Sequence, residues 1–234
     1  MEKVIFYAPQ ILSDNLLPED ESGHCIRVLR KKEGDGIFIT DGEGHFFDAI
    51  ITNPHPKRCL VEIVKTIDHP KGWNNTLHIA FAPTKNLDRV EWFAEKATEI
   101  GIDCITPLLT RHSERKEIKT PRIQKIVVSA MKQSQKASLP VLSEMVPFVK
   151  FIKQSFVGQK FIAHCHAGEK PLLKDIYTRG EDVLILIGPE GDFSEQEVEQ
   201  ALKEGFVPIS LGNSRLRTET AALVACNTVQ IMNE

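Results

Sequence analysis

From Leu77 onward, short apolar runs alternate with stretches of helical periodicity, and this alternation constrains the fold more than any other feature. The apolar runs predict strands at 77–83, 104–109, 160–166, 182–188 and 207–211. Helices are predicted at 88–100 and 122–136, and after each of the last two strands. Near-continuous apolar strands that alternate with helices are typical of a largely parallel sheet covered on both faces. The larger, C-terminal part of the chain is therefore predicted to be an α/β domain.

The first 70 residues have a different pattern. Short β-rich runs alternate with turn signals, and Asp41–Gly44 reads DGEG, a strong hairpin candidate. Residues 68–76 (DHPKGWNNT) lose the hydrophobic pattern and gather Pro, Gly and Asn. We therefore expect an all-β domain at 1–70 and a second domain at 73–234.

The composition is that of an ordinary globular protein, with 41% hydrophobic and 26% charged residues in 234. No apolar run approaches the roughly 20 residues that cross a bilayer, and the first residues lack a signal-peptide pattern. A cytoplasmic location without membrane contact is therefore expected. The five cysteines are scattered without a C-x-x-C pair, which favours reduced, mostly buried thiols. His164, Cys165 and His166 are expected on a strand, where neighbours face opposite ways, so no metal site is predicted.

The charge is unevenly distributed along the chain, although the net charge is only -3. Residues 27–32 (RVLRKK) carry four cations and no acid, and residues 111–136 carry eight cations against two acids. Such segregation fits local basic surfaces that bind a polyanion. Solvated helix faces would produce the same pattern, and the charge alone does not decide between the two.

The turn Gly188–Asp192 (GPEGD) follows a predicted strand and precedes a predicted helix. Glycines at such a turn often bind phosphate, but Pro189 has no N–H to donate, and Glu190 and Asp192 would repel an anion. A ligand with hydroxyls, an amine or a fixed positive charge fits better. The alternative is that Gly188 and Gly191 only shape a tight turn.

Ligands of open α/β sheets gather beyond the carboxyl ends of the strands, and two further segments of this chain follow predicted strands. Ser194 and Glu197 form a predicted capping box, with Phe193 and Val198 as a hydrophobic staple and Gly205 as the helix end, so these residues have a structural explanation. The polar stretch 211–220 contains Arg217, Thr218 and Glu219. Arg217 and Glu219 could instead pair with each other, with Thr218 as a helix N-cap.

Four segments together resemble the RsmE family of ribosomal RNA methyltransferases, within the SPOUT superfamily. They are LILIGPEGDFSEQEVEQA, ISLGNSRLRTETAALVA, EKATEIGIDCITPL and RVLRKKEGD, and they span essentially the whole chain in the family's order. The resemblance implies a SPOUT domain with a C-terminal trefoil knot and a mostly parallel sheet, an N-terminal PUA-like β-barrel that helps bind RNA, and a homodimer. It also implies methyl transfer from S-adenosyl-L-methionine to N3 of a uridine in 16S rRNA of the assembled 30S subunit.

The same resemblance implies the functional residues. The cofactor would be bound by His164, Ile187, Gly188, Pro189, Glu190, Gly191, Leu211, Gly212, Leu216, Arg217, Thr218 and Thr220. Arg217 would stabilise negative charge on a uracil oxygen, and Glu219 would accept the N3 proton or orient Arg217. RNA would contact Arg27, Arg30, Lys31, Lys32, Lys132 and Lys136 through its phosphates.

The chain departs from the family pattern at a few positions. Asp192 stands where the family usually has Gly, Lys132 replaces an acid, and Lys136 replaces an Arg. Two other functions fit the same fold and basic surfaces: a non-catalytic RNA-binding factor for ribosome assembly, and a SPOUT enzyme for another RNA base. An intact LRTETA loop favours an enzyme.

Overall fold

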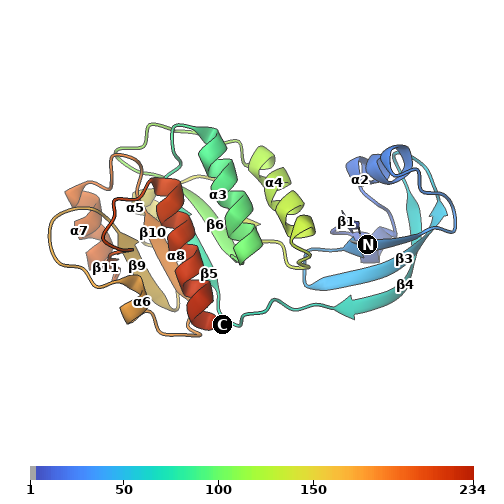
Figure 1. The fold of residues 1–234 in the computed structure, drawn as a ribbon. Helices are drawn as coiled ribbons and strands as arrows, with labels where there is room; N and C mark the ends of the chain where they lie inside the picture. The colour runs from blue at the N-terminus through green and yellow to red at the C-terminus, as the bar shows by residue number, and fades with distance from the viewer. Residues whose placement is uncertain (1–3) are drawn as a thin grey trace. The chain divides into compact units, whose positions relative to one another are not determined.

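The computed structural model describes residues 4–234, which form two compact units (Figure 1). The first unit runs to Gly72 and also takes in Val128–Leu139. The second unit comprises Trp73–Val127 and Pro140–Glu234. The change of unit at Gly72 falls within the predicted boundary at 68–76. Sequence patterns gave no indication that Val128–Leu139 groups with the first unit.

The second unit is built on a parallel sheet, as predicted. Its strands are β5 (Leu77–Phe81), β6 (Cys104–Leu109), β7 (Val141–Leu142), β8 (Val146–Pro147), β9 (Gln159–Ala163), β10 (Val183–Ile187) and β11 (Val207–Ile209). Their order is β11-β9-β10-β5-β6-β7, β8 also pairs with β6, and every pair is parallel. All five residues of β10 are buried, which explains why its sequence is continuously apolar.

Helices cover both faces of this sheet. They are α3 (Leu87–Ile100), α4 (Thr120–Gln133), α5 (Phe148–Phe151), α6 (Leu173–Ile176), α7 (Glu195–Lys203) and α8 (Thr218–Asn233). Helix α8 packs on β5 and β10 and lies beside α3 (Figure 1). Leu184 and Leu186 pack with Phe148 of α5, and with Phe193 and Val198 at the start of α7. Because alternate residues of β10 face opposite ways, one strand serves both layers.

The first unit contains a four-stranded sheet in the order β1-β2-β3-β4. The strands are β1 (Ile5–Tyr7), β2 (Gly36–Thr40), β3 (His45–Asn53) and β4 (Leu60–Asp68). β1 is parallel to β2, and the other pairs are antiparallel. The turn between β2 and β3 contains the predicted DGEG hairpin. Leu139 N donates to Gly42 O at 2.8 Å and Gly44 N donates to Ala137 O at 2.9 Å, which ties residues 137–139 to this hairpin.

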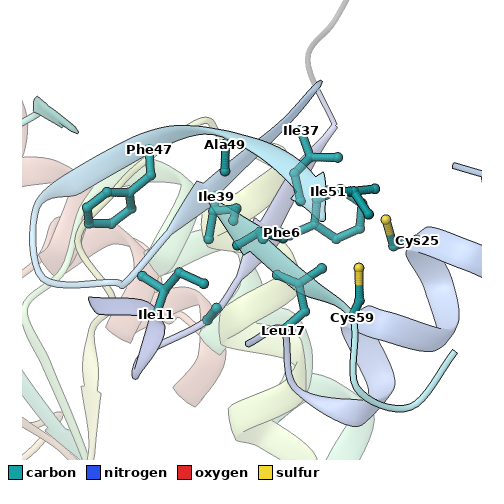
Figure 2. Close-up of a cluster of buried hydrophobic side chains, with 12 residues drawn as sticks. Phe6, Ile11, Leu17, Cys25, Ile37, Ile39, Phe47, Ala49, Ile51 and Cys59 are labelled. Carbon is teal, nitrogen blue, oxygen red and sulfur yellow. The ribbon is translucent and has the colours of Figure 1, made fainter. Parts of the chain in front are cut away.

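The prediction of an all-β first domain is wrong for residues 11–28. They form α1 (Ile11–Asp14), α2 (Glu19–Gly23) and a π-helical turn, η1 (His24–Val28). Ile11 of α1, Cys25 of η1 and Leu17 between α1 and α2 lie on the apolar face of the sheet, where they join Phe6 and Phe47 in one core (Figure 2). A four-stranded sheet with one apolar face needs such a cover to be stable.

The thiols follow the predicted pattern in part. Cys25, Cys59 and Cys226 are buried, Cys104 is half-buried and Cys165 is exposed, and all five are free. Cys25 and Cys59 lie near one another in the core of the first unit (Figure 2). Within residues 4–234, no helix has the length and apolar character needed to cross a membrane.

Candidate active site

A cavity of about 1070 Å³ opens beyond the carboxyl ends of β9, β10 and β11, three neighbouring strands. Each strand contributes the loop that follows it, and the walls are residues 163–168 with Lys170, residues 187–190 with Asp192, and residues 209–218 with Ala221. This is the place where parallel α/β sheets bind ligands. The cavity therefore joins three segments that are far apart in the sequence.

The middle wall is the turn Gly188–Asp192, and close packing requires the first of its two glycines, Gly188. A Cβ at Gly188 would lie 3.1 Å from both the backbone nitrogen and the ring of Phe193. Glu190 lines the cavity, and its Oε1 accepts a hydrogen bond of 3.0 Å from Lys85 N. Glu190 thus holds the β5–α3 loop against this turn and places a carboxylate at the cavity.

Asp192 adopts a left-handed conformation, with φ of 62°. Glycine enters this region without strain, and Asp tolerates it better than most residues, which accounts for Gly being usual here. The side chain makes contacts that glycine cannot make. Its Oδ2 accepts from Cys165 N at 2.7 Å and its Oδ1 accepts from Phe193 N at 2.8 Å. Asp192 therefore links the loop after β9 to the loop after β10.

The third wall is tied to the middle wall through Thr218. Its hydroxyl donates to Gly188 O at 3.0 Å and is buried. Arg217 occupies the N-cap position of α8, so Thr218 is the first helical residue and not the N-cap. The Arg217 side chain is exposed, lines the cavity and makes no hydrogen bond or ion pair with another residue in 4–234. Its guanidinium is available to a ligand.

Glu219 lies outside the walls of the cavity. Its Oε1 is 3.6 Å from Arg89 Nε on α3, and its Oε2 is buried and accepts no hydrogen bond from the described residues. The suggested pairing of Arg217 with Glu219 is wrong, because Arg89 takes that place. Glu219 therefore anchors the first turn of α8 to α3.

The loop after β9 carries two histidines with different surroundings. The predicted strand 160–166 ends at Ala163, so His164, Cys165 and His166 lie in the loop that lines the cavity. His166 Nε2 donates to Phe193 O at 2.6 Å. Burial and the nearby Lys170 lower the pKa of His164, and its buried Nδ1 has no partner in the described chain. His164 thus presents a neutral imidazole to the cavity.

The described residues include no group of three or more His, Cys, Asp or Glu side chains arranged to hold a metal ion. The capping box of α7 is confirmed, since Ser194 Oγ accepts from Glu197 N and Glu197 Oε2 accepts from Ser194 N. Glu197 also accepts from Arg111 N at 2.8 Å through its other oxygen. Ser194 and Glu197 are therefore structural, as the sequence indicated.

Most predicted cofactor residues lie on the cavity, namely His164, Ile187, Gly188, Pro189, Glu190, Leu211, Gly212, Leu216, Arg217 and Thr218. Gly191 and Thr220 do not line it. Gly191 faces His112, whose Cβ lies 3.2 Å from the position of an added Cβ. Sequence reasoning missed most of the loop after β9, including His166 and Lys170. Its position at the end of an apolar strand was the available signal.

The six predicted RNA-binding residues all lie in the first unit. Arg27 is in η1, and Arg30, Lys31 and Lys32 follow it. Arg27, Arg30 and Lys32 are exposed, whereas Lys31 Nζ donates to Gly36 O at 3.2 Å. Lys132 pairs with Glu21 at 2.6 Å, so its charge is compensated. Lys136 is in the Val128–Leu139 segment of the same unit.

Comparisons with known proteins agree with this geometry. Residues 71–230 match the model of the RNA methyltransferase domain family, and residues 17–64 match the RNA methyltransferase PUA domain. The ribosomal RNA small subunit methyltransferase E of Buchnera aphidicola (from Acyrthosiphon pisum) is 30% identical over 222 residues, which is 91% of this chain and 86% of that protein. The chain belongs to the RsmE family.

Solved structures support the RsmE fold over the full length. A probable rRNA-methyltransferase from Porphyromonas gingivalis has 46% identity and a TM-score of 0.92, and 98% of each chain is covered. An RsmE from Neisseria gonorrhoeae, bound to S-adenosyl methionine, has 28% identity and a TM-score of 0.85, covering 98% of this chain and 97% of that one. The α/β domain with its parallel sheet and the PUA-like domain are thus confirmed, and the trefoil knot stays a prediction.

Proposed function

We propose that this RsmE protein methylates N3 of a uridine in 16S rRNA, acting on the assembled small subunit. Membership of the RsmE family makes it an rRNA methyltransferase that uses S-adenosyl-L-methionine. The observation that carries the finer proposal is the Arg217 guanidinium, which is exposed on the cavity and unpaired within the described chain. A fixed cation at this position suits a substrate that becomes an anion before it attacks.

The residues of the cavity fit the cofactor. S-adenosyl-L-methionine carries a sulfonium, an amine and hydroxyls, and it supplies an electrophilic methyl group when bound. Glu190 offers a carboxylate that favours such groups, and the unpartnered Nδ1 of His164 offers one further polar contact. Gly188 packs closely against Phe193, where a side chain would not fit, and this packing fixes the turn that lines the cavity. These residues would bind and orient the cofactor.

The residues of this chain also fit the chemistry of uridine. The N3 proton must leave before N3 can attack a methyl group, so the site has to favour the uracil anion. Arg217 can donate two directed hydrogen bonds to a uracil oxygen and remains charged at every physiological pH. Glu219 is buried, lies away from the cavity and pairs with Arg89. In our proposal Glu219 acts as a positioning residue that holds the turn of α8 that presents Arg217.

The proposal includes a homodimer in the cytoplasm. Trp92 on α3 is 41% exposed and Ile231 on α8 is 60% exposed, and the two helices pack side by side. Large apolar side chains left exposed on neighbouring helices are typical of a surface that a partner covers. A second copy of the chain would bury them. Light scattering that gives the mass of a monomer at micromolar concentration would contradict this part of the proposal.

The test compares rRNA from cells with and without this protein by mass spectrometry of the modified nucleotides. We expect a single uridine to lose an N3 methyl group, and purified protein to restore it on isolated small subunits. A methyl group on another base would favour the alternative SPOUT activity. Binding without turnover would favour a non-catalytic assembly factor.

Arg217→Lys then tests the role of the unpaired guanidinium on the cavity. It keeps the charge but loses the paired donors, so we expect turnover to fall by roughly 10²–10³ with cofactor still bound. Arg179→Lys is the matched control, because Arg179 is exposed and lies outside the cavity walls. Equal turnover of the two variants would contradict the role of Arg217.

A further inference from the structure

The loop between β6 and α4, residues 110–119, is basic and has no part in the cofactor cavity. Its sequence, TRHSERKEIK, has four cations and two acids. Hydrogen bonds fix this loop to three neighbours: the helix α7, the turn Gly188–Asp192 and the loop between β5 and α3.

The start of the loop is a tight turn. Thr110 N donates to Ser113 Oγ at 3.0 Å, Ser113 N donates to Thr110 O at 3.2 Å, and both residues are buried. Arg111 then joins this turn to α7. Its backbone N donates to Glu197 Oε1 at 2.8 Å, and its Nη1 donates to Gln196 Oε1 at 2.9 Å. The loop is thereby held against the helix that follows the cofactor turn.

His112 attaches the loop directly to the cofactor turn. Its Nδ1 lies 3.0 Å from Asp192 O and 3.2 Å from Gly191 O. Both partners are carbonyls, so Nδ1 carries the proton and donates. The glycine at 191 permits this approach, since a Cβ there would lie 3.2 Å from His112 Cβ. Close contact with His112 of this loop therefore explains the glycine at 191.

Arg115 attaches the loop to a second neighbour, the loop between β5 and α3. Its Nε donates to Thr84 O at 3.1 Å and its Nη2 donates to Lys85 O at 2.5 Å. Lys85 N in turn donates to Glu190, which lines the cavity. A hollow of about 350 Å³ lies here, lined by Lys85, Glu114, Arg115, Lys116 and Glu117. Lys85, which lines this hollow, is one hydrogen bond from Glu190 on the cavity wall, and Arg115 is two.

Three cations of the loop have no carboxylate partner. Lys116 and Lys119 are exposed and form no ion pair within residues 4–234. The Arg111 guanidinium contacts only the neutral amide of Gln196. Lys85 does pair with Glu114 at 3.0 Å, but both side chains are more than half exposed, so that pair is weak. The loop therefore presents uncompensated positive charge beside the cavity.

We propose that the β6–α4 loop binds phosphates of the rRNA strand and so places the target nucleotide at the methyl-donor cavity. The proposal rests on the rRNA substrate of the proposed function and adds a second basic surface to the one in the first unit. Phosphate contacts fix the register of a nucleic acid without reading its sequence. The loop bonds directly to Asp192 through His112, and Arg115 bonds it to Lys85, whose N donates to Glu190. These bonds fix the position of the loop relative to the residues around the cofactor.

The test uses Lys116→Gln/Lys119→Gln, which removes two charges that have no structural partner in the described chain. The control is Lys153→Gln/Lys203→Gln, which makes the same change at exposed lysines outside the loop and the cavity. Binding of each variant to purified small subunits is measured from low to high salt. Each phosphate contact contributes about 0.7–0.9 to the slope of log K against log salt. We expect the slope of the loop variant to fall by about 1.4–1.8, and that of the control to stay unchanged.

Cofactor affinity, measured by calorimetry, should be the same for both variants, since neither touches the cavity. A loop variant whose salt slope matches the control would overturn the proposal. The binding measurement needs no methyl transfer, so it is independent of the chemistry. If the loop variant keeps the salt slope of the wild type and the methylated atom is N3 of a uridine, the loop proposal fails and the proposed function stands. If the slope falls but another base is methylated, the proposed target nucleotide is wrong and the loop proposal stands.

Discussion

The hydroxyl of Thr218 donates a hydrogen bond of 3.0 Å to the carbonyl of Gly188, and this bond joins two of the three walls of the cofactor cavity. Thr218→Val keeps the shape of the side chain and removes the donor. A buried carbonyl without a partner costs about 1–3 kcal/mol. We expect the free energy of unfolding to fall within that range and cofactor affinity to weaken, measured by denaturation and calorimetry. Thr228→Val, later in the same helix and away from the cavity, is the control and should leave the affinity unchanged.

The left-handed backbone of Asp192 separates two substitutions that remove the same side-chain contacts. Both Asp192→Gly and Asp192→Ala lose the bonds to Cys165 N and Phe193 N. Alanine also has to adopt φ of 62°, which costs about 1–2 kcal/mol that glycine does not incur. We expect the alanine variant to be the less stable by about 1 kcal/mol in urea denaturation. Equal stability of the two would show that Asp192 does not hold this conformation in solution.

Glu219 and Arg89 should behave as one unit if Glu219 positions α8. Glu219→Ala and Arg89→Ala are then expected to lower turnover to a similar extent, and the double variant should be little worse than either. Removal of a catalytic base would instead affect Glu219→Ala far more strongly. The measurement is a double-mutant cycle on kcat with cofactor saturating. Additive losses would contradict the pairing seen between α3 and α8.

The stability of the second unit should fall on mild acidification because of His78 on β5. Burial lowers the pKa of His78 to about 4, below the ordinary value of 6.5. Between these values the unfolded chain binds a proton that the folded chain excludes, so stability is full above pH 6.5 and is lost as the pH falls towards 4. The loss between pH 7 and pH 5 is on the order of 1–2 kcal/mol.

Denaturation at the two pH values measures this loss, and His78→Gln should reduce it. Glutamine can keep a hydrogen bond to Thr106 Oγ1, which lies 2.9 Å from His78 Nε2, and it does not titrate. The same pH dependence in the variant would assign the effect to other groups.

The sequence predicted the features that depend on residues close to one another in the chain. The five predicted strands exist because each is a run of apolar residues, although 160–166 was drawn three residues too long. The capping box was correct because Ser194 and Glu197 are three residues apart and interact locally. The helices α1 and α2 were missed because four or five residues are too few to show helical periodicity.

Long-range partners could not be read in this way. Glu219 and Arg89 are distant in the sequence, and only the packing of α8 on α3 brings them together. The same holds for the anchoring of the β6–α4 loop, where His112 meets Asp192. Ten of the twelve cofactor residues that the resemblance implied line the cavity, and they lie in the segments that follow β9, β10 and β11.

The strand order has a consequence for the nascent chain. The cavity needs residues 209–218, which run from the end of β11 to the start of α8. During synthesis β5, β6, β9 and β10 emerge before these residues and can pair, whereas the third wall emerges later. A chain released before Thr218 would keep most of its sheet and lack the bond to Gly188. Cofactor binding therefore becomes possible only after Thr218 has been added, so a chain that stalls earlier should form most of this sheet without a complete cofactor cavity.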